Sequence, residues 1–284
     1  MGKFSDAILK SEKEKSQGAV DLSRIPDIED ADHNRPGINT GIPVGAIGNR
    51  DHNIDEKIIS FHLPGSYEAE QFRLLKTGLI FSVKNKIPKT IMVTSAEPDD
   101  GKSFIASNLA VTFAQSLDSH VVLMDCDLRN STVHKIFGIP DSHKGLSDWL
   151  DGDISFQSIL HKTQIDKFSI IPGGKRPVNP SEMLSSAKMI DLLDELKSRY
   201  TDRYIIIDTP PPLLTAEAIA LSTLVDGILI VVKHEKTSRK SLKKLIEVIG
   251  EEKILGVILN QYDVRTEKYY GSSNYGKYYN KRSI

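Results

Sequence analysis

Apolar runs alternate with amphipathic segments from residue 90 onward, and this alternation indicates the fold. Several strand candidates are unbroken apolar runs, such as VVLM, YIII and ILIVV, which are typical of strands covered on both faces by helices. The strand candidates are residues 90–94, 121–125, 168–172, 204–208, 227–232 and 254–259. The helix candidates are residues 102–117, 180–199, 215–224 and 237–249, with shorter pieces near 131–137, 146–150 and 155–160. The pattern predicts an α/β fold, a doubly wound and mostly parallel sheet flanked by helices, with ligands at the carboxyl ends of the strands.

The amino-terminal segment, residues 1–60, lacks this periodicity. It is rich in Lys, Glu, Asp, Gly, Pro and Asn and poor in aromatic residues, so we expect it to be mostly disordered. A short helix within residues 3–15 would place Phe4, Ala7 and Ile8 on one side. A solvated charged segment is the plainer interpretation of this stretch, and a docking helix for a partner is the sharper one.

The folded domain is expected to span residues 61–261 and to begin with a helix within residues 61–85. The sequence SYEAEQFRLLKTGLIFSV carries an apolar stripe at the spacing of one helix face. The stripe consists of Phe72, Leu75, Leu79 and Ile80. On a neighbouring face, Glu70, Arg73 and Lys76 follow each other three residues apart, a solvated ladder in which each pair contributes about 0.2–0.5 kcal/mol.

Composition and charge exclude several classes of protein. Apolar residues make up 39% and charged residues 26% of the 284-residue chain, as in a globular protein of one or two domains. A formal net charge of −1 gives no general affinity for nucleic acid or anionic membranes. The basic stretch KTSRKSLKKL at 236–245 is therefore interpreted as a solvated face. The single cysteine excludes an internal disulfide, and no apolar run approaches the roughly 18 residues of a membrane span, so we expect a soluble, cytosolic protein.

A candidate phosphate-binding loop follows the first strand of the domain. TIMVTSAEPDDGKS, residues 90–103, is a strand and a polar loop that ends in Gly101-Lys102-Ser103, before a helix. Loop amides and a helix N-terminus favour a phosphate anion. Lys102 adds a cation at the β- and γ-phosphates, and the Ser103 hydroxyl can ligate Mg²⁺.

This loop departs from the pattern G-x-x-x-x-G-K-[ST]. Ala96 replaces the first glycine, and the carboxylates of Glu97, Asp99 and Asp100 lie near a site for a polyanion. Taken alone, the loop is as well explained by an ordinary strand-to-helix turn.

Two aspartates end the next apolar strand. VVLMDCDLRN, residues 121–130, closes with Asp125-x-Asp127-x-Arg129. Residues two apart on a strand point to the same side, so both carboxylates are expected at the carboxyl edge of the sheet, where α/β active sites lie. The same alternation turns Cys126 to the opposite side, and we interpret it as a packing residue. A cap for the following helix is the alternative role of the aspartates.

A third strand also ends in a carboxylate. YIIIDTPPP, residues 204–212, places Asp208 where a Walker-B carboxylate would hold Mg²⁺ through water. Pro210, Pro211 and Pro212 prevent further strand pairing and fix a stiff loop beside the site. Three strand-end motifs that each supply a part of phosphoryl transfer favour an ATP site over chance.

Together with the tyrosine-rich end of the chain, these motifs resemble the bacterial tyrosine kinases (BY-kinases). SAEPDDGKS, LMDCDLR and IIIDTPP stand where that family has its deviant Walker A, A′ and B motifs, and the resemblance covers about residues 66–284. GLSDWLDGD at 145–153 and GGKRPVNPSEMLSS at 173–186 also resemble family segments, with Val178 in place of a proline.

The resemblance extends to a signature for self-association. Glu70-x-x-Arg73-x-x-Lys76 is similar to the family's E-x-x-R-x-x-R oligomerisation signature, and its third position keeps the charge but loses the bidentate guanidinium. The resemblance implies a ring-like homo-oligomer assembled through this helix.

The resemblance also implies an ATP- and Mg²⁺-dependent protein-tyrosine autokinase. Its nucleotide site would comprise the loop, the first helical turn and a base contact, namely Ala96, Glu97, Pro98, Asp99, Asp100, Gly101, Lys102, Ser103, Phe104 and Asn260. Its catalytic residues would be Lys102, Asp125, Asp127 and Asp208, with Ser103, Asp127 and Asp208 on the metal and Asp125 as the candidate base. The phosphoacceptors would be Tyr269, Tyr270, Tyr275, Tyr278 and Tyr279, in a flexible tail at residues 262–284 that is phosphorylated in trans.

The partners implied are those of capsule and exopolysaccharide synthesis and export. They are a membrane-anchored polysaccharide co-polymerase or adaptor that recruits the protein to the inner face of the membrane, and a cognate tyrosine phosphatase. Nucleic acid is not expected as a partner. Two alternatives stay open. A positioning switch related to cell-division and plasmid-partition ATPases would carry a signature lysine where this chain has Glu97, and a catalytically inactive scaffold is kept open by Asp99 and Asp100.

Overall fold

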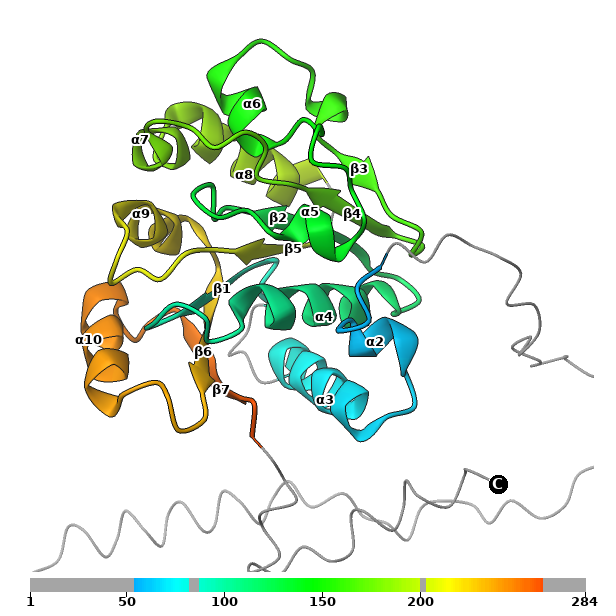
Figure 1. Ribbon diagram of the computed structural model, residues 1–284, viewed down its shortest axis with the longest axis vertical. Helices are drawn as coiled ribbons and strands as arrows, with labels where there is room; N and C mark the ends of the chain where they lie inside the picture. Colours follow the sequence, from blue (N-terminus) through cyan, green and yellow to red (C-terminus); the bar gives the residue numbers. More distant parts are fainter. Residues whose placement is uncertain (1–53, 82–86, 200–202, 263–284) are drawn as a thin grey trace, which may run out of the picture. The chain divides into compact units, whose positions relative to one another are not determined.

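The computed structural model describes residues 54–81, 87–199 and 203–262 (Figure 1). The disorder expected for residues 1–53, the docking helix expected within residues 3–15 and the tyrosines of the tail after Tyr262 lie outside the described residues.

A seven-stranded sheet in the order β3-β4-β2-β5-β1-β6-β7 organises the described chain (Figure 1). The six predicted strands all form, as β1 (Thr90–Ser95), β2 (His120–Asp125), β4 (Phe168–Ile171), β5 (Arg203–Asp208), β6 (Gly227–Lys233) and β7 (Ile254–Asn260). Neighbouring strands among these six pair in parallel. The seventh, β3 (His161–Lys162), pairs antiparallel with β4 and is too short to show a period in the sequence. The predicted doubly wound, mostly parallel sheet is confirmed.

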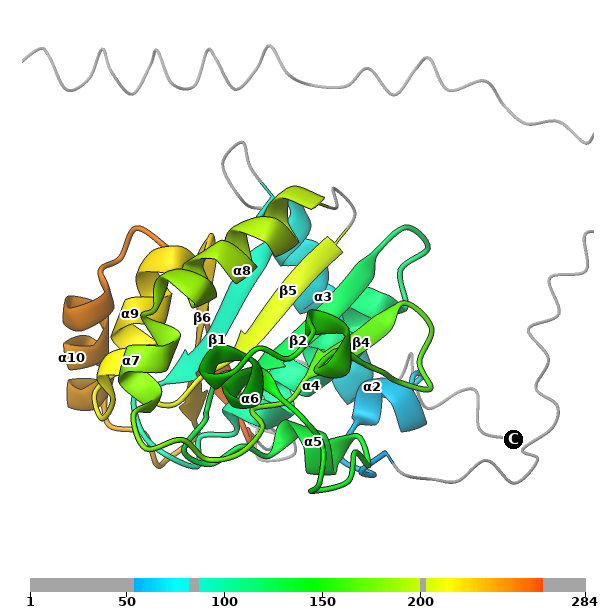
Figure 2. The ribbon, with the colours of Figure 1, turned by 90° about the horizontal axis from the view of Figure 1, so that it is seen from above.

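Helices cover both faces of this sheet (Figures 1 and 2). One face carries α2 (Ile59–His62), α3 (Tyr67–Phe81), α4 (Lys102–Ala114) and α5 (Val133–Ile136). The other carries α6 (Leu146–Asp151), η3 (Phe156–Ser158), α7 (Pro180–Leu184), α8 (Ala187–Arg199), α9 (Ala216–Leu224) and α10 (Arg239–Ile249).

Strand alternation divides the apolar residues between two cores. In β1, Ile91 and Val93 pack under α3 and α4, whereas Met92 packs under the helices of the opposite face, and all three are fully buried. This double burial explains the unbroken apolar runs, because neither side of a central strand meets water. Burial of an apolar side chain of this size contributes about 1.5–3 kcal/mol relative to its exposure.

Two helix predictions differ from the structure. The helix after the loop ends at Ala114, so Leu117, the last residue of the predicted helix, lies beyond it and is 90% exposed. The single helix predicted over residues 180–199 is divided into α7 and α8. Between them the Ser185 hydroxyl donates to Ser181 O at 2.7 Å, and the Ser186 hydroxyl accepts from Met189 N at 3.3 Å. Serine side chains that satisfy backbone groups in this way end one helix and start the next.

The folded domain begins earlier than the residue 61 expected from composition. Ile54 and Ile58 are buried in the core under α3 and α4. The amide of Ser60 donates to Asn108 Oδ1 at 3.0 Å, and Asn108 Nδ2 donates to Lys57 O at 3.2 Å. Two isolated isoleucines among polar residues gave too weak a period to be recognised, but they fix this segment against α4.

Candidate active site

The loop that follows β1 adopts left-handed backbone angles at two positions. Asp99 has φ 60° and Gly101 has φ 94°. An aspartate tolerates this region better than most residues, so it takes over a role that glycine commonly fills. At Gly101 no larger residue fits, because an added Cβ would lie 2.1 Å from Nδ2 of Asn260.

Asp100 holds the loop from inside the protein. Its side chain is fully buried, and Oδ1 accepts a hydrogen bond from Thr237 Oγ1 at 2.8 Å. Its backbone carbonyl accepts from Asn260 Nδ2 at 2.8 Å. Burial raises the pKa of Asp100, although the bond from Thr237 opposes the rise. Asn260 was predicted as a contact to the nucleotide base. In the structure its side-chain amide binds the loop itself.

The remaining predicted loop residues have different surroundings. Ala96 is buried in the core on the α6–α10 face, whereas Pro98 is exposed. Glu97 Oε1 accepts from Ser238 N at 3.3 Å, just before α10. Phe104 packs edge-to-face against Phe72 of α3, with ring centroids 6.1 Å apart, so its side chain belongs to the core.

Lys102 and Ser103 form the first turn of α4. Gly101, at the cap position, provides no side chain to satisfy the first amides of the helix, so these amides stay available to an anion. Lys102 is 8% exposed. A phosphate group at this helix end would meet both the amides and the ammonium.

Asp208 lies at the carboxyl end of β5, beside this turn. It is 1% exposed, and within the described chain neither of its carboxylate oxygens has a hydrogen-bond partner. Burial, and next the charge of Asp125, raise its pKa to about 8, while Ser103 and Lys102 oppose the rise.

Magnesium fits these donors. A buried carboxylate without a partner is costly, and a divalent cation would relieve it. The described residues include no cluster of three or more His, Cys, Asp or Glu side chains with metal-ligand geometry. Mg²⁺ is commonly held by one or two carboxylates together with waters and substrate phosphates, so Asp208 and Ser103 beside a phosphate site suffice.

Asp125 lies on β2 directly opposite Asp208 on β5. Its Oδ2 accepts from Ser131 Oγ at 2.7 Å and from the amides of Thr132 and Val133 at 3.1 Å. Asp125 therefore caps α5, which is the alternative role considered for it. Burial and the charge of a neighbouring carboxylate raise its pKa to about 6, although the Ser131 bond opposes the rise.

Asp127 lies beyond the end of β2, so strand alternation does not place it on the face of Asp125. It is half-buried, its amide donates to Asp125 Oδ1 at 3.1 Å, and its Oδ1 accepts from Asn130 N at 3.0 Å. Its charge still raises the pKa values of Asp125 and Asp208. Cys126 is fully buried in the core on the α6–α10 face, which confirms it as a packing residue.

An ion pair that sequence reasoning missed ties the Asp127 loop to the opposite layer. Arg129 binds Glu217 of α9 through two nitrogens, and Glu217 also accepts from Ser181 Oγ of α7. Glu217 is 1% exposed, and its pKa is lowered because these bonds outweigh the effect of burial. The available signal was a lone glutamate in the apolar helix AEAIALSTL, since a buried carboxylate needs a cation.

The stiff loop predicted after β5 is tied to β1. Thr94 Oγ1 donates to Pro210 O, and Thr209 Oγ1 donates to Val93 O, each at 3.1 Å. The two further motif segments also meet each other, because Ser147 N donates to Gly173 O at 3.0 Å. The two bonds to β1 fix the position of the loop that follows Asp208.

Of the predicted ladder, the pair of Glu70 and Arg73 forms, whereas Lys76 does not continue it. Arg73 pairs with Glu70 and donates to Pro64 O at 2.7 Å. Lys76 instead turns to the C-terminal end of α4, where its Nζ donates to Ser116 Oγ at 2.8 Å. Burial, and next the charge of Arg73, lower the pKa of Lys76.

Residues 88–256 match the family model of an AAA domain. Tyrosine-protein kinase YwqD of Bacillus subtilis is 34% identical over 225 residues, which are 78% of this chain and 93% of the relative. The chain belongs to the bacterial tyrosine-protein kinase family. The kinase domain of Escherichia coli tyrosine kinase ETK shares the fold with a TM-score of 0.70 and 31% identity, over 79% of this chain and 86% of that chain.

Two further proteins resemble this chain over a smaller part of their length or less closely. The putative tyrosine-protein kinase EpsB of Ralstonia nicotianae is 30% identical over 80% of this chain, but the match covers 30% of its own length. The chain thus spans less than a third of some kinases in the family and nearly all of YwqD. The septum site-determining protein MinD of Pyrococcus horikoshii, complexed with Mg-ADP, is 25% identical with a TM-score of 0.51 over 61% of this chain and 72% of that chain. None of the helices within the described ranges has the length and apolar character to cross a bilayer.

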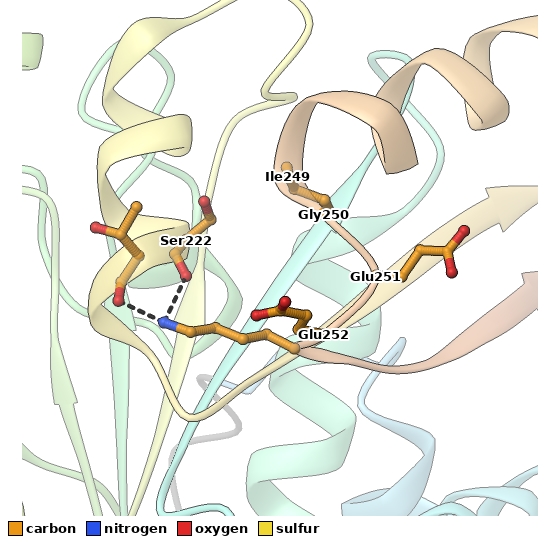
Figure 3. A pocket seen from close by; sticks show the side chains of 7 residues that line it. Ser222, Ile249, Gly250, Glu251 and Glu252 are labelled. Carbon is orange, nitrogen blue, oxygen red and sulfur yellow. Dashed lines mark hydrogen bonds between the residues drawn. The ribbon is translucent and has the colours of Figure 1, made fainter.

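A pocket of about 280 Å³ lies beside the amino-terminal end of β7 (Figure 3). It is lined by Ser222 and Thr223 at the end of α9 and by residues 249–253 before β7. Lys253 Nζ donates to the carbonyls of Ser222 and Thr223, so the lysine closes the end of the helix. This pocket is separate from the candidate active site.

Proposed function

We propose that this chain is an ATP- and Mg²⁺-dependent protein-tyrosine kinase that phosphorylates its own C-terminal tyrosines. The observation that carries the proposal is the pair of opposed, fully buried aspartates, Asp125 and Asp208, next to the first turn of α4 with Lys102 and Ser103. The family relationship supports the same activity, and the Mg-ADP of MinD supports the same ligands on a related fold.

In this proposal each residue performs a distinct task. The loop amides and Lys102 hold the phosphates, and Ser103, Asp208 and Asp127 hold Mg²⁺, directly or through water. Asp125 Oδ1, which accepts a bond from Asp127 N whereas Oδ2 accepts three, takes the proton from the incoming tyrosine hydroxyl. Bound Mg²⁺ neutralises phosphate charge. Positioning and charge compensation account for most of the catalysis, as is usual for phosphoryl transfer.

The proposed acceptors are the tail residues Tyr269, Tyr270, Tyr275, Tyr278 and Tyr279. Phosphorylation in trans, within a homo-oligomer formed through the helix that carries Glu70, Arg73 and Lys76, delivers one tail to the site of a neighbour. The exposed Leu74 on the same helix, 56% accessible, supports a contact surface there.

The family resemblance also implies a cellular role. We propose regulation of capsule or exopolysaccharide synthesis, with a membrane-anchored adaptor that recruits the kinase to the inner face of the membrane and a tyrosine phosphatase that resets the tail. A non-kinase positioning ATPase is disfavoured because Glu97 stands at the position of the signature lysine and binds Ser238 N.

Intact-mass spectrometry after incubation with Mg·ATP tests the activity, with Lys102→Met as the control. We expect several additions of about 80 Da, one for each phosphate, that map to the tail and are absent from the control. Steady ATP hydrolysis without additions, in the presence of the adaptor, would show a positioning ATPase instead. Neither signal under the same conditions would show an inactive scaffold.

A further inference from the structure

The solvent face of α10 and the turn before it carry a set of cations that the proposed catalytic function does not use. We name it the α10 stripe, and it consists of Lys236, Arg239, Lys240, Lys243 and Lys244, all exposed. Leu245 is fully buried on the opposite side of the helix and fixes which face is turned outward. The carboxylates nearby in sequence are Glu235, Glu247, Glu251 and Glu252, and Glu97 is close in space because its Oε1 accepts from Ser238 N at 3.3 Å. Glu247 lies 3.9 Å from Lys243, with both side chains well exposed. An exposed pair of this kind is weak, so the stripe keeps a large positive charge.

The tyrosine-rich tail begins next to this stripe. The carbonyl of Asn260, at the end of β7, accepts from His234 N at 2.9 Å. The ring of Tyr262 then packs edge-to-face on the ring of His234, with centroids 5.0 Å apart. His234 precedes Lys236 by two residues, so the last described residue of the chain lies at the start of the stripe.

The tail is long enough to cover the whole stripe. The 11 residues of α10 extend over about 16 Å at 1.5 Å per residue. Tyr269 follows Tyr262 by seven residues, which span at most about 25 Å when extended. The phosphoacceptor tyrosines can therefore reach every cation of the α10 stripe in the same molecule.

Phosphorylation reverses the charge of the tail. Residues 263–284 contain five cations (Arg265, Lys268, Lys277, Lys281 and Arg282) and two carboxylates (Asp263 and Glu267), so the unmodified tail is repelled by the stripe. Each phosphate adds about −1.5 to −2 charges. Five of them make the tail strongly negative and supply oxygens that lysine and arginine bind well.

We propose that the phosphorylated tail, residues 263–284, docks on the α10 stripe of its own chain, and that the unmodified tail does not. This inference rests on the proposed function, since it requires phosphorylated tyrosines. Docking removes the product tail from the aspartate-rich site of a neighbouring molecule. Phosphorylation of the tail thus also makes the tail able to bind the α10 stripe.

Binding of a synthetic tail peptide tests the docking. The protein is the 284-residue chain with the substitution Lys102→Met, so no phosphate is added by the kinase itself. Labelled peptides of residues 263–284 are compared by fluorescence anisotropy, one with five phosphotyrosines and one with none. We expect the phosphopeptide to bind at least about tenfold more tightly, and to lose affinity between 50 and 200 mM salt, because the contacts are electrostatic and about a Debye length or less apart.

A matched pair of charge variants locates the binding site. Neutralising Arg239, Lys240, Lys243 and Lys244 to Gln is expected to weaken phosphopeptide binding about tenfold. The control removes four exposed cations elsewhere, by replacing Lys57, Lys135, Lys144 and Lys162 with Gln, and is expected to change affinity less than about twofold. Equal effects of the two sets would overturn the proposal. So would loss of binding to phosphatidylglycerol vesicles in the first set with unchanged phosphopeptide affinity, because the stripe would then be a lipid site.

Ligation of the phosphopeptide after Tyr262 of the same Lys102→Met protein tests docking within one chain. We expect this protein to bind the labelled phosphopeptide about tenfold more weakly, because its own tail occupies the stripe. Unchanged affinity would overturn docking in the same molecule. These measurements need no kinase activity, so absence of autophosphorylation in the mass assay would refute the proposed function and leave the binding result unaffected.

Discussion

Asp125 and Asp208 stand directly opposite each other on β2 and β5, and both are fully buried. Two parallel strands that end at the same height bring their last carboxylates together without any contribution from the loops. Burial, and in addition the charge of Asp127, raise the pKa of Asp125 to about 6. Burial, and next the charge of Asp125, raise the pKa of Asp208 to about 8. The pair is therefore unfavourable when fully ionised, unless a cation lies between the carboxylates and the phosphates.

The first prediction concerns stability and pH. In the folded protein the carboxyl of Asp208 keeps its proton up to about pH 8, whereas the unfolded chain loses it near the ordinary value of 3.8. The folded state therefore binds more protons, and the free energy of unfolding falls as pH rises from about 4 to 8. We expect Asp208→Asn to gain on the order of 1–3 kcal/mol over the parent at pH 8.5 and less at pH 5.5.

Denaturant unfolding at the two pH values, without Mg²⁺, measures this difference. Asp166→Asn, at an exposed aspartate, is the control and should unfold like the parent at both. Parallel pH curves for Asp208→Asn and the parent would contradict the raised pKa.

The second prediction concerns the proposed base. The Ser131 hydroxyl donates to Asp125 Oδ2 at 2.7 Å and lowers the pKa of Asp125. Ser131→Ala removes that bond, so the pKa rises and the ionised base becomes scarcer at a given pH. We expect the acid limb of the kcat profile to move to higher pH by about half a unit or more, with little change in KM for ATP. A uniform loss of rate at all pH values would indicate a structural role only.

The third prediction concerns the hydrogen bond from Thr237 to Asp100 of the loop. Thr237→Val keeps the shape of the side chain but leaves the buried Asp100 without its partner. The loop amides then lose part of their fixed arrangement, and we expect KM for ATP to rise about three- to tenfold, since a lost buried hydrogen bond is worth about 1 kcal/mol. Thr223→Val, whose hydroxyl bonds within the exposed end of α9, is the matched control. Equal KM values for both variants would refute the coupling.

The fourth prediction concerns the ion pair between layers. Arg129→Ala leaves Glu217 buried with Ser181 alone, and we expect a loss of about 1–3 kcal/mol in the free energy of unfolding. The double variant Arg129→Ala/Glu217→Gln should recover part of it, because no unpaired charge remains. Lys243→Ala breaks an exposed pair and should change stability by less than about 0.5 kcal/mol. No recovery in the double variant would show that packing, rather than charge, stabilises this contact.

The fifth prediction concerns the start of the domain. A chain that begins at residue 63 lacks Ile54 and Ile58, and we expect it to be less stable by about 3 kcal/mol or more than one that begins at residue 51. Thermal unfolding of the two chains measures the difference. Similar melting temperatures would show that the contacts of this segment with α4 do not stabilise the domain.

Much of the fold was predictable because the unbroken apolar sequence of a central strand shows that both of its faces are buried. VVLM and ILIVV have no polar residue that would turn a face to water, so the parallel sheet followed directly. Boundaries were less predictable wherever a single side chain decides them. Ser185 and Ser186 divide a helix through local hydrogen bonds, and Ile54 and Ile58 extend the domain through contacts made with α4 about 50 residues away.

The candidate site was predictable to the same degree. Asp125, Asp208, Lys102 and Ser103 are brought together because each lies at the end of an adjacent element of a parallel sheet. The partners that tune them were not predictable. Ser131 is an ordinary loop serine in the sequence, and the pairs Asp100–Thr237 and Arg129–Glu217 join residues 137 and 88 positions apart.

The amide of Asn260 grips the carbonyl of Asp100, and the tail departs two residues later. The phosphate loop and the root of the tail are thereby connected by a tether of three residues. In the proposed reaction in trans, a displacement of the tail toward a neighbouring molecule would load the hydrogen bond between Asn260 and the carbonyl of Asp100. The position of the tail is thus mechanically coupled to the proposed nucleotide site of the same molecule.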